Sequence, residues 1–195
     1  MEKTIQLAIN RFGAEYSEAR GQRLHKSMLT LKEGRVEAAK QGIEEGVALR
    51  VLVNGAWGFA SVGSINIETL TSAMSDACKM AKTASSRLKI PIKLAKAKAV
   101  EDHVQTKSKK NPSAISIEEK INTAMSFNEA ALSYDKRVKS CTVDYLDTTG
   151  TNYFTNSEGA CIEQDKMYVW SRITAAALSK GVFTFRRLFC FPSTV

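Results

Sequence analysis

The chain has 195 residues, of which 44% are hydrophobic and 25% charged, and this balance excludes wholesale disorder. No apolar run approaches the ~20 residues of a membrane-spanning helix, and residues 1–6 are too polar for the apolar core of a secretory signal. The four cysteines are scattered, with no C-x-x-C pair, so we expect free thiols in a reducing compartment. These features predict a cytoplasmic protein with no membrane partner.

The net charge of +8 is concentrated in one stretch of the chain. Between Lys79 and Lys110 there are ten Lys and Arg residues but only two acidic ones, which leaves the rest of the chain balanced. A nucleic-acid binder spreads such charge over its folded faces and places aromatic residues among the cations. Because Lys93, Lys96 and Lys98 have no aromatic residue between them, nucleic acid is an unlikely partner and a solvated linker is the better interpretation.

The first part of the chain is predicted to be a helix followed by antiparallel strands. Its predicted elements are a helix over 4–12, strands over 15–20, 22–32 and 35–41, a Glu33-Gly34 turn between the last two, and a hairpin over 46–60. In the hairpin Val47, Leu49 and Val51 alternate with other residues at the period of a half-buried strand. Asn54-Gly55 favours the two positive φ angles of a type I′ turn.

The rest of the chain contains the helix that completes the first unit and then repeats the order of one helix followed by antiparallel strands. Its predicted elements are a helix over 66–88 capped by Asn66, an exposed linker over 91–113, a helix over 116–133 with a capping box at Ser116, and strands over 138–147, 151–156 and 161–178 with turns at Thr149-Gly150 and Ser157-Glu158-Gly159. From Glu33-Gly34 and from Glu158-Gly159, a long hairpin arm runs to a second turn, Asn54-Gly55 or Lys180-Gly181. The two halves therefore look like rough copies of one unit.

These elements predict an α+β fold with two helix-plus-antiparallel-meander units, in which helices cover the sheet. The predicted domains are a first unit with its following helix over 1–90, a basic linker over 91–113, a second unit over 114–182 and an atypical tail over 183–195.

One segment resembles a known family. Residues 46–61, Gly-Val-Ala-Leu-Arg-Val-Leu-Val-Asn-Gly-Ala-Trp-Gly-Phe-Ala-Ser, are similar to the strand-turn-strand signature of the TldD/PmbA proteins, also called modulators of DNA gyrase. Supporting matches lie at 16–20, 100–102, 116–119 and 153–159, so the resemblance extends to about Gly181. It implies a metallopeptidase subunit that pairs with a second family subunit, in a homo- or heterodimer, and acts on peptides or unfolded protein.

The family resemblance implies zinc for the full-length protein but no metal or other cofactor in this chain. The family holds its metal through a helical His-Glu-x-x-x-His motif in the carboxy-terminal half, and this sequence contains no such motif. Its two histidines, His25 and His103, have no helical His or Glu at i+3 or i+4, the spacing that places two ligands on one helix face. We therefore assign no catalytic, cofactor or metal residue and expect the chain alone to cleave nothing.

The segment 182–195 has an unusual composition, with four phenylalanines and a cysteine in fourteen residues. Because the pattern changes abruptly after Gly181, we expect a truncated or out-of-frame end, with the missing half encoded further downstream. The alternative is a natural terminal strand tucked into the sheet.

The candidate site is the signature hairpin, where Arg50, Asn54, Gly55, Trp57 and Phe59 are the residues of interest. Trp57 and Phe59 share one strand face and could line a peptide cleft, although burial against the helices is the interpretation we prefer. Arg50 lies on the face opposite Leu49 and is expected to be solvated or paired, not catalytic. Glu163 and Asp165 share a strand face and are expected to be ordinary surface. The rival function is a stand-alone module that binds protein or nucleic acid.

Overall fold

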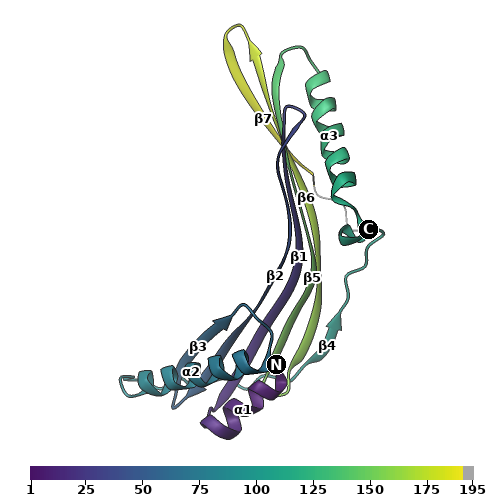
Figure 1. The fold of residues 1–195 in the computed structure, drawn as a ribbon. Coiled ribbons are helices and arrows are strands. Elements are labelled where there is room, and N and C mark those ends of the chain that lie inside the picture. The colour runs from purple at the N-terminus through teal and green to yellow at the C-terminus, as the bar shows by residue number, and fades with distance from the viewer. Residues whose placement is uncertain (191–195) are drawn as a thin grey trace. The chain divides into compact units, whose positions relative to one another are not determined.

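The computed structural model describes residues 1–190 and confirms an α+β fold (Figure 1). The helices are α1 (Glu2–Phe12), α2 (Ile67–Ser85), α3 (Ile117–Ser133) and a short 3-10 turn, η1 (Pro112–Ala114). The strands are β1 (Tyr16–Lys32), β2 (Arg35–Val53), β3 (Ala56–Val62), β4 (Glu101–Val104), β5 (Val138–Asn156), β6 (Cys161–Ser179) and β7 (Val182–Cys190). In these residues no helix is long and apolar enough to cross a membrane.

The strands form one sheet in the order β3-β2-β1-β5-β6-β4, and β7 pairs with β6 as well. The central neighbours, β1 and β5, run antiparallel: Ser157 N donates to Ser17 O at one end and Glu33 N donates to Cys141 O at the other. Each therefore brings its own meander, β1-β2-β3 or β5-β6-β7, to the sheet. Two helix-plus-meander units are present, as predicted: α1 with β1-β2-β3, and α3 with β5-β6-β7. The strands of the second meander differ from the prediction, since its third strand, β7, lies in the segment expected to be an atypical tail.

Contacts divide the chain into two compact units that each draw on three segments. Unit 1 comprises Met1–Arg23, Glu44–Gln105 and Thr151–Asp165, and unit 2 comprises Leu24–Ile43, Thr106–Gly150 and Lys166–Val195. The four long strands contribute residues to both units, because each is 17 or 19 residues long.

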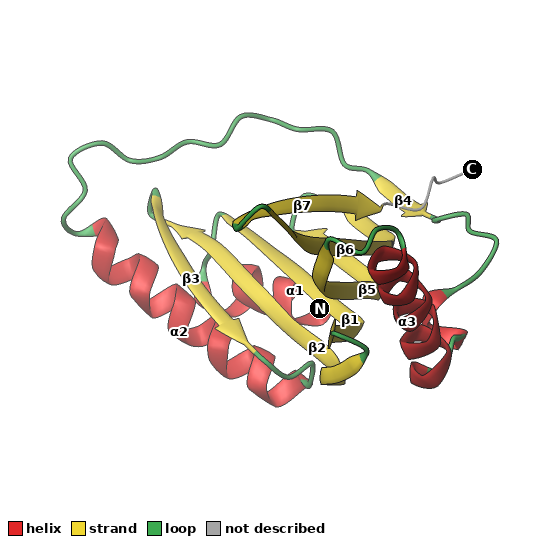
Figure 2. Ribbon diagram, turned by 90° about the horizontal axis from the view of Figure 1, so that it is seen from above, coloured by secondary structure: helices red, strands yellow, loops and turns green. Residues whose placement is uncertain are grey.

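In unit 1, α1 and α2 cover the same face of the sheet (Figure 2). The core between them contains alternate residues of β2, together with Ile5 and Ala8 of α1 and Met74 and Ala77 of α2. Helix α2 lies close to β3 at Gly58, where a Cβ atom would meet the Ala77 carbonyl oxygen. Asn66 caps α2 as predicted, since its side chain accepts a hydrogen bond from Thr69 N.

In unit 2, α3 packs against β1 and β5. Leu29 and Leu31 of β1 and Cys141 and Val143 of β5 form the core with Ala124 of the helix. Ser116 caps α3 as predicted, since its Oγ accepts from Glu119 N.

A buried ion pair ties α3 to the sheet of unit 2. Lys120 Nζ lies 2.7 Å from Asp147 Oδ2 and donates to Ser27 Oγ, with the Lys120 and Asp147 side chains only 2% and 3% exposed. Burial and the hydrogen bond to Asp147 raise the pKa of Tyr145 in the same region. Because removal of either charged partner would leave a buried charge, this pair fixes the helix on its strands.

Three of the predicted turns place two successive residues at positive φ, as a type I′ turn requires. This geometry was expected for Asn54-Gly55, and the structure shows it at Glu33-Gly34 and Lys180-Gly181 as well. The prediction of a turn at Thr149-Gly150 is wrong, because β5 runs without a break from Val138 to Asn156. Thr148 and Thr149 are buried there, so pairing with β1 and β6 on both sides outweighs the local turn signal of a Thr-Gly pair.

The segment after Gly181 continues the sheet through Cys190. Val182–Cys190 forms β7, antiparallel to β6, with Phe185 opposite Ala176 and Leu188 opposite Ile173. For residues 182–190 the structure thus agrees with the terminal-strand alternative, and the rest of the tail lies outside the described residues.

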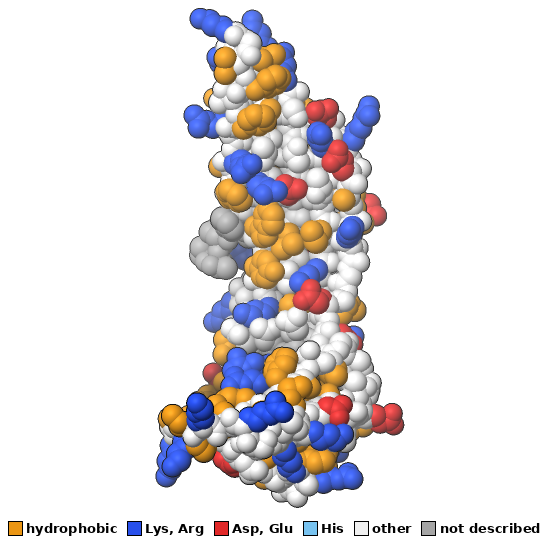
Figure 3. All heavy atoms as spheres, turned by 90° about the vertical axis from the view of Figure 1, so that its left-hand side faces the viewer, with side chains coloured by type: hydrophobic (Ala, Val, Ile, Leu, Met, Phe, Trp, Pro, Cys, Tyr) orange, Lys and Arg blue, Asp and Glu red, His pale blue; other side chains and the backbone are white. Residues whose placement is uncertain are grey.

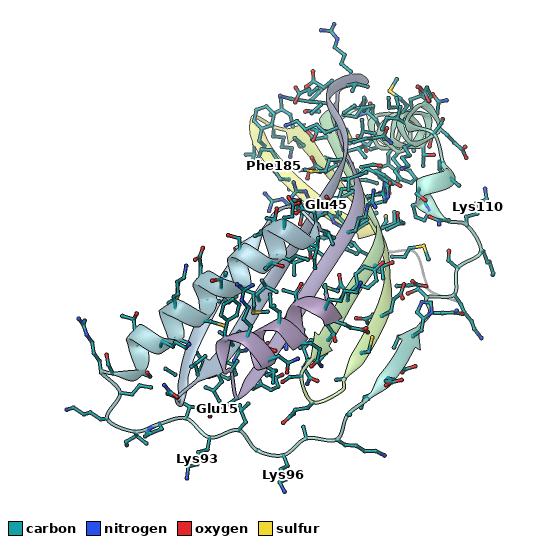
Figure 4. The ribbon with its side chains drawn as sticks, turned by 60° about the horizontal axis from the view of Figure 1, so that its bottom comes forward. Glu15, Glu45, Lys93, Lys96, Lys110 and Phe185 are labelled. Carbon is teal, nitrogen blue, oxygen red and sulfur yellow. The ribbon has the colours of Figure 1, made fainter. Side chains whose placement is uncertain are left out.

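The basic linker is exposed, and residues 89–100 have no helix or strand apart from bends at its start. Lys93 and Lys96 point away from the protein (Figure 4). The linker is nevertheless anchored at both ends of this stretch, since Ile92 N donates to Gly55 O and Cys161 N donates to Val100 O. Sequence reasoning missed β4, the four-residue strand that follows.

We predict that Gly55→Ala lowers the free energy of unfolding by about 2–3 kcal/mol. Gly55 has a φ of 70°, and an added Cβ would lie 2.5 Å from Pro91 Cβ, so the substitution combines backbone strain with a clash. Gly13→Ala is the matched control: Gly13 has a φ of 68° with nothing within 4 Å of the added atom, and strain alone should cost about 1 kcal/mol. Equal losses in denaturant unfolding would contradict the contact with Pro91.

Candidate functional site

The open face of the unit 1 sheet, opposite α1 and α2, carries the candidate site. Ser17 of β1 faces the helices, because its Oγ donates to Ile5 O, and Ala19 is in the helix-covered core. Strand alternation therefore places Tyr16, Glu18 and Arg20 on the open face.

Strand β2 and its partner β3 add Arg50, Trp57 and Phe59 to this open face. In their register Arg50 is opposite Phe59, and the helix-facing Val51 is opposite Gly58. The signature hairpin thus contributes its large polar and aromatic side chains to the sheet face that no helix covers.

Glu18 is the acidic centre of this surface. Its side chain is 8% exposed, and its Oε1 lies 3.4 Å from both Arg20 Nε and Arg50 NH1. Its other oxygen, Oε2, accepts a 2.8 Å hydrogen bond from the Tyr16 hydroxyl. Burial, and then this bond to Glu18, raise the pKa of Tyr16 to about 12. One buried carboxylate therefore holds two guanidinium groups side by side.

Both guanidinium groups also stack on aromatic rings. Arg50 lies 4.1 Å from the centroid of Trp57, and Arg20 lies 4.9 Å from the centroid of Phe154. Trp57 meets Tyr16 edge to face, with the ring centroids 6.0 Å apart. Such stacking holds an arginine side chain in a defined position while its N–H groups stay available.

The two arginines have spare hydrogen-bonding capacity. Each guanidinium carries five N–H donors, and within residues 1–190 the polar contact of each is the single 3.4 Å approach to Glu18. Their side chains remain 65% and 43% exposed. With one carboxylate against two guanidinium groups, the cluster keeps an excess positive charge that suits a carboxylate ligand.

A groove of about 480 Å³ adjoins the arginine cluster within unit 1. Its walls come from five neighbouring strands, with Arg20 and Phe154 shared with the cluster and amides from Gln22, Asn152 and Gln164. Asn152 Oδ1 is buried and accepts no hydrogen bond from the described residues. Amide and guanidinium groups beside aromatic rings are the chemistry that binds a peptide backbone and its side chains.

The structure brings together three of the five predicted site residues. Arg50, Trp57 and Phe59 share the open face, whereas Asn54 and Gly55 form the turn at the hairpin tip. The preferred interpretation that Trp57 and Phe59 bury against the helices is wrong: Phe59 is 50% exposed, and Trp57 packs on Tyr16 and Arg50 instead. Arg50 is paired, as expected.

Sequence reasoning missed the partners that β1 and β5 supply, namely Tyr16, Glu18, Arg20, Phe154 and Asn156. The signals were the family matches at 16–20 and 153–159 and the alternation of polar and small residues over 16–20, which marks a strand with two different faces. Nothing local indicates that Phe154, over a hundred residues away, lies beside Arg20.

The residues present do not fit a catalytic metal. Residues 1–190 contain no group of three or more His, Cys, Asp or Glu side chains that could hold an ion. His103 Nε2 lies 3.6 Å from Asp165 Oδ1, which is one ion-pair contact between exposed side chains.

Three of the four cysteines are poor nucleophiles. Burial raises the pKa of the Cys78 and Cys141 thiols, and desolvation followed by a hydrogen bond with Glu2 raises that of Cys161. A raised pKa keeps these sulfurs as the unreactive thiol.

Comparison with protein families identifies both halves of the chain. Residues 17–81 match the family model described as PmbA/TldA metallopeptidase domain 1, and residues 110–188 match the PmbA/TldA metallopeptidase central domain. The chain belongs to the TldD/PmbA family. The match to residue 188 means that the expected departure from the family pattern after Gly181 is wrong for the first residues of β7.

Curated relatives and solved structures support the assignment to the TldD/PmbA family. A metalloprotease of Methanocaldococcus jannaschii is 32% identical over 149 residues, which are 76% of this chain and 33% of that protein. A metalloprotease of Methanothermobacter thermautotrophicus is 28% identical over 163 residues, 84% of this chain and 34% of its own length. The chain therefore spans about a third of the length of these TldD/PmbA-like relatives.

The fold recurs in crystal structures at 18% identity. One is a candidate modulator of a DNA gyrase from Thermotoga maritima, with a TM-score of 0.76 over 99% of this chain and 42% of that chain. Another is TldE from Thermococcus kodakarensis, with a TM-score of 0.71 over 98% of this chain and 42% of that chain. The names of the curated relatives imply a metal for the longer proteins, and the described residues supply no ligand set for it.

We predict that Tyr16→Phe lowers the free energy of unfolding by about 1–2 kcal/mol at neutral pH, because Glu18 Oε2 loses its hydrogen bond. The pKa of Tyr16 is higher in the folded chain than its ordinary value of 10, so the folded state holds this proton more tightly. The advantage of the parent chain over Tyr16→Phe should be constant below about pH 10 and shrink as the pH rises through about 12. Urea unfolding across this pH range measures the difference, and a difference that grows above pH 10 would contradict it.

Proposed function

We propose that the chain is the amino-terminal, non-catalytic portion of a TldD/PmbA-like metallopeptidase subunit. In this role unit 1 forms one wall of a peptide cleft, and unit 2 contributes to pairing with a second family subunit. Proteolysis belongs to the longer protein, whose metal, zinc by family resemblance, is held by residues outside this chain. Four free cysteines fit a cytoplasmic location.

The observation that carries the cleft proposal is the arginine–aromatic surface of unit 1. Its guanidinium donors, exposed aromatic ring of Phe59 and adjoining amide-lined groove are all on the sheet face that no helix covers. A surface with spare donors and flat apolar rings can bind an extended chain without reading one particular sequence.

The edge strand β3 supports the same function. It lies at the end of the strand order, paired with β2 on one side only, so its other edge can accept an extended peptide as an added strand. The helix α2 covers one face of β3, which leaves the Phe59 face for substrate side chains.

The support for subunit pairing is the apolar surface of β7 in unit 2. Phe183 and Phe185 share one face of this strand and are 59% and 64% exposed. Figure 3 shows the side of the molecule that carries β7, with hydrophobic side chains at the surface there and basic ones among them. Exposed aromatic side chains in a row are the usual anchors of protein interfaces.

The rival is a stand-alone binding module that uses the basic linker for nucleic acid. Lys93 and Lys96 are exposed, yet their segment has no aromatic residue to stack on bases. The two functions differ in their salt dependence, because phosphate contacts weaken steeply as salt rises.

We predict that the chain binds an unstructured, labelled peptide in fluorescence anisotropy without cleaving it, and that Arg50→Ala weakens the affinity about tenfold. Arg50 is the more buried of the two guanidinium groups and is fixed on Trp57. Arg11→Ala is the matched control, since Arg11 also stacks on an aromatic ring but lies on helix α1. Equal affinities for both variants would contradict the cleft, and tighter binding of single-stranded DNA that is lost in salt would favour the rival.

We predict that the chain self-associates in sedimentation velocity and that Phe185→Asp weakens this association at least tenfold, because an apolar anchor becomes a charge. Ile90→Asp is the control, since Ile90 is 80% exposed directly before the linker and its substitution should leave association unchanged. A parent chain that stays monomeric at about 100 μM, or a Phe185→Asp chain that associates as well as the parent, would overturn the pairing role of β7.

A further inference from the structure

The last two strands of each meander can be aligned in sequence, residue for residue, when counted from their final turns. Counted back from Asn54-Gly55 and Lys180-Gly181, Val47, Leu49 and Val51 of β2 take the positions of Ile173, Ala175 and Ala177 of β6. Counted forward, Gly58, Ala60 and Val62 of β3 take the positions of Thr184, Arg186 and Leu188 of β7.

The helices that precede the meanders follow the same repeat. Ile5, Ala8, Ile9 and Phe12 of α1 have the i, i+3, i+4, i+7 spacing of one helix face, and these residues pack in the core of unit 1. In α3 the residues Phe127, Ala130 and Ala131, together with the C-cap residue Tyr134, have the same spacing. Each unit therefore has an apolar helix face that accompanies its second and third strands.

We call the surface formed by this helix face and the second and third strands the seat. In unit 1 the seat is covered by a helix of the same chain. Helix α2 follows β3 and buries Leu70, Met74, Ala77 and Ala81 against α1, β2 and β3. Small residues allow the close approach, most of all Gly58, whose position leaves no room for a side chain beneath Ala77.

In unit 2 the equivalent seat is an open apolar groove. A cavity of about 480 Å³ is lined by Phe127 and Ala131 of α3 and its C-cap residue Tyr134, by Ala175 and Ala177 of β6 and by β7. The lining residues are the repeat equivalents of those that hold α2. No helix among residues 1–190 lies over them, and Tyr134 and Leu188 are 88% and 60% exposed.

We propose that this groove of unit 2 is a docking site for one amphipathic helix of the α2 type, a second apolar surface distinct from the Phe183–Phe185 face of β7. Strand alternation places Thr184, Arg186 and Leu188 on the groove side of β7 and Phe183 and Phe185 on the other. The occupant presents Ala, Leu and Met at i, i+3, i+4 and i+7, as α2 does to unit 1.

The differences between the two seats specify the partner further. Thr184 replaces Gly58, so the docked helix stands further from β7, while Ala175 and Ala177 replace Leu49 and Val51 and admit it more deeply over β6. Arg186 replaces Ala60 and has no ion-pair partner among the described residues. The helix is therefore expected to carry an acidic residue on the flank that meets β7.

The test uses a labelled synthetic peptide with the sequence of residues 66–86, which contains α2 and its cap, added to the full chain. An isolated helix of this length is marginal in water, so binding should raise its helicity in circular dichroism as well as its anisotropy. Leu188→Asp should weaken binding at least tenfold. Tyr168→Asp is the control, because it places the same charge at an exposed position, 48% against 60%, on β6, where strand alternation puts Tyr168 on the face opposite Ala175 and Ala177.

Ala177→Glu, on β6 at the floor of the groove, is the second groove variant and should weaken binding to a similar degree. Melting curves identify a groove variant that fails to fold. The peptide affinity of the other groove variant then tests the proposal. The proposal is overturned if the parent chain does not bind the peptide at millimolar concentration, or if the folded groove variants bind it as tightly as Tyr168→Asp does. The second outcome would mean that the peptide displaces α2 in unit 1.

Discussion

The antiparallel pairing of β1 with β5 is the constraint on which the rest of the structure depends. It joins two copies of a helix-plus-meander unit at the centre of one sheet. In unit 1 it brings Phe154 beneath Arg20 and Asn156 beside the Tyr16 hydroxyl. In unit 2 it places Ser27 of β1 and Asp147 of β5 at the same lysine of α3. A register shift of one residue would send each of these side chains to the other face.

The shared plan of the two units accounts for the different roles that we propose for them. Each has a helix-covered face built from odd-numbered residues of the long strands. In unit 1 that face is closed by α1 and α2, so only the opposite face, with Glu18 and its two arginines, is free to bind. In unit 2 α3 closes part of the corresponding face, and the remainder forms the apolar groove beside β7.

Local signals were enough to predict the helices, their caps and the type I′ turn at Asn54-Gly55, because each depends on residues close together in the sequence. Asn54-Gly55 and Asn66 are examples in which one or two side chains determine the backbone. The uninterrupted course of β5 through Gly150 could not be predicted in this way, since it results from hydrogen bonding to β1 and β6 on both sides. The same holds for Trp57 and Phe59: alternation predicts that they share a face, but only the position of the helices decides which face.

The central claim is that the open face of unit 1 and the edge of β3 receive an extended peptide. Hydrogen exchange with mass-spectrometric detection, with and without a saturating unstructured peptide, tests it most directly. Added backbone hydrogen bonds at a strand edge slow amide exchange in that strand. The account predicts new protection confined to residues 56–62 and the neighbouring hairpin strand. Unchanged exchange there, or protection restricted to the basic linker over residues 91–113, would contradict it.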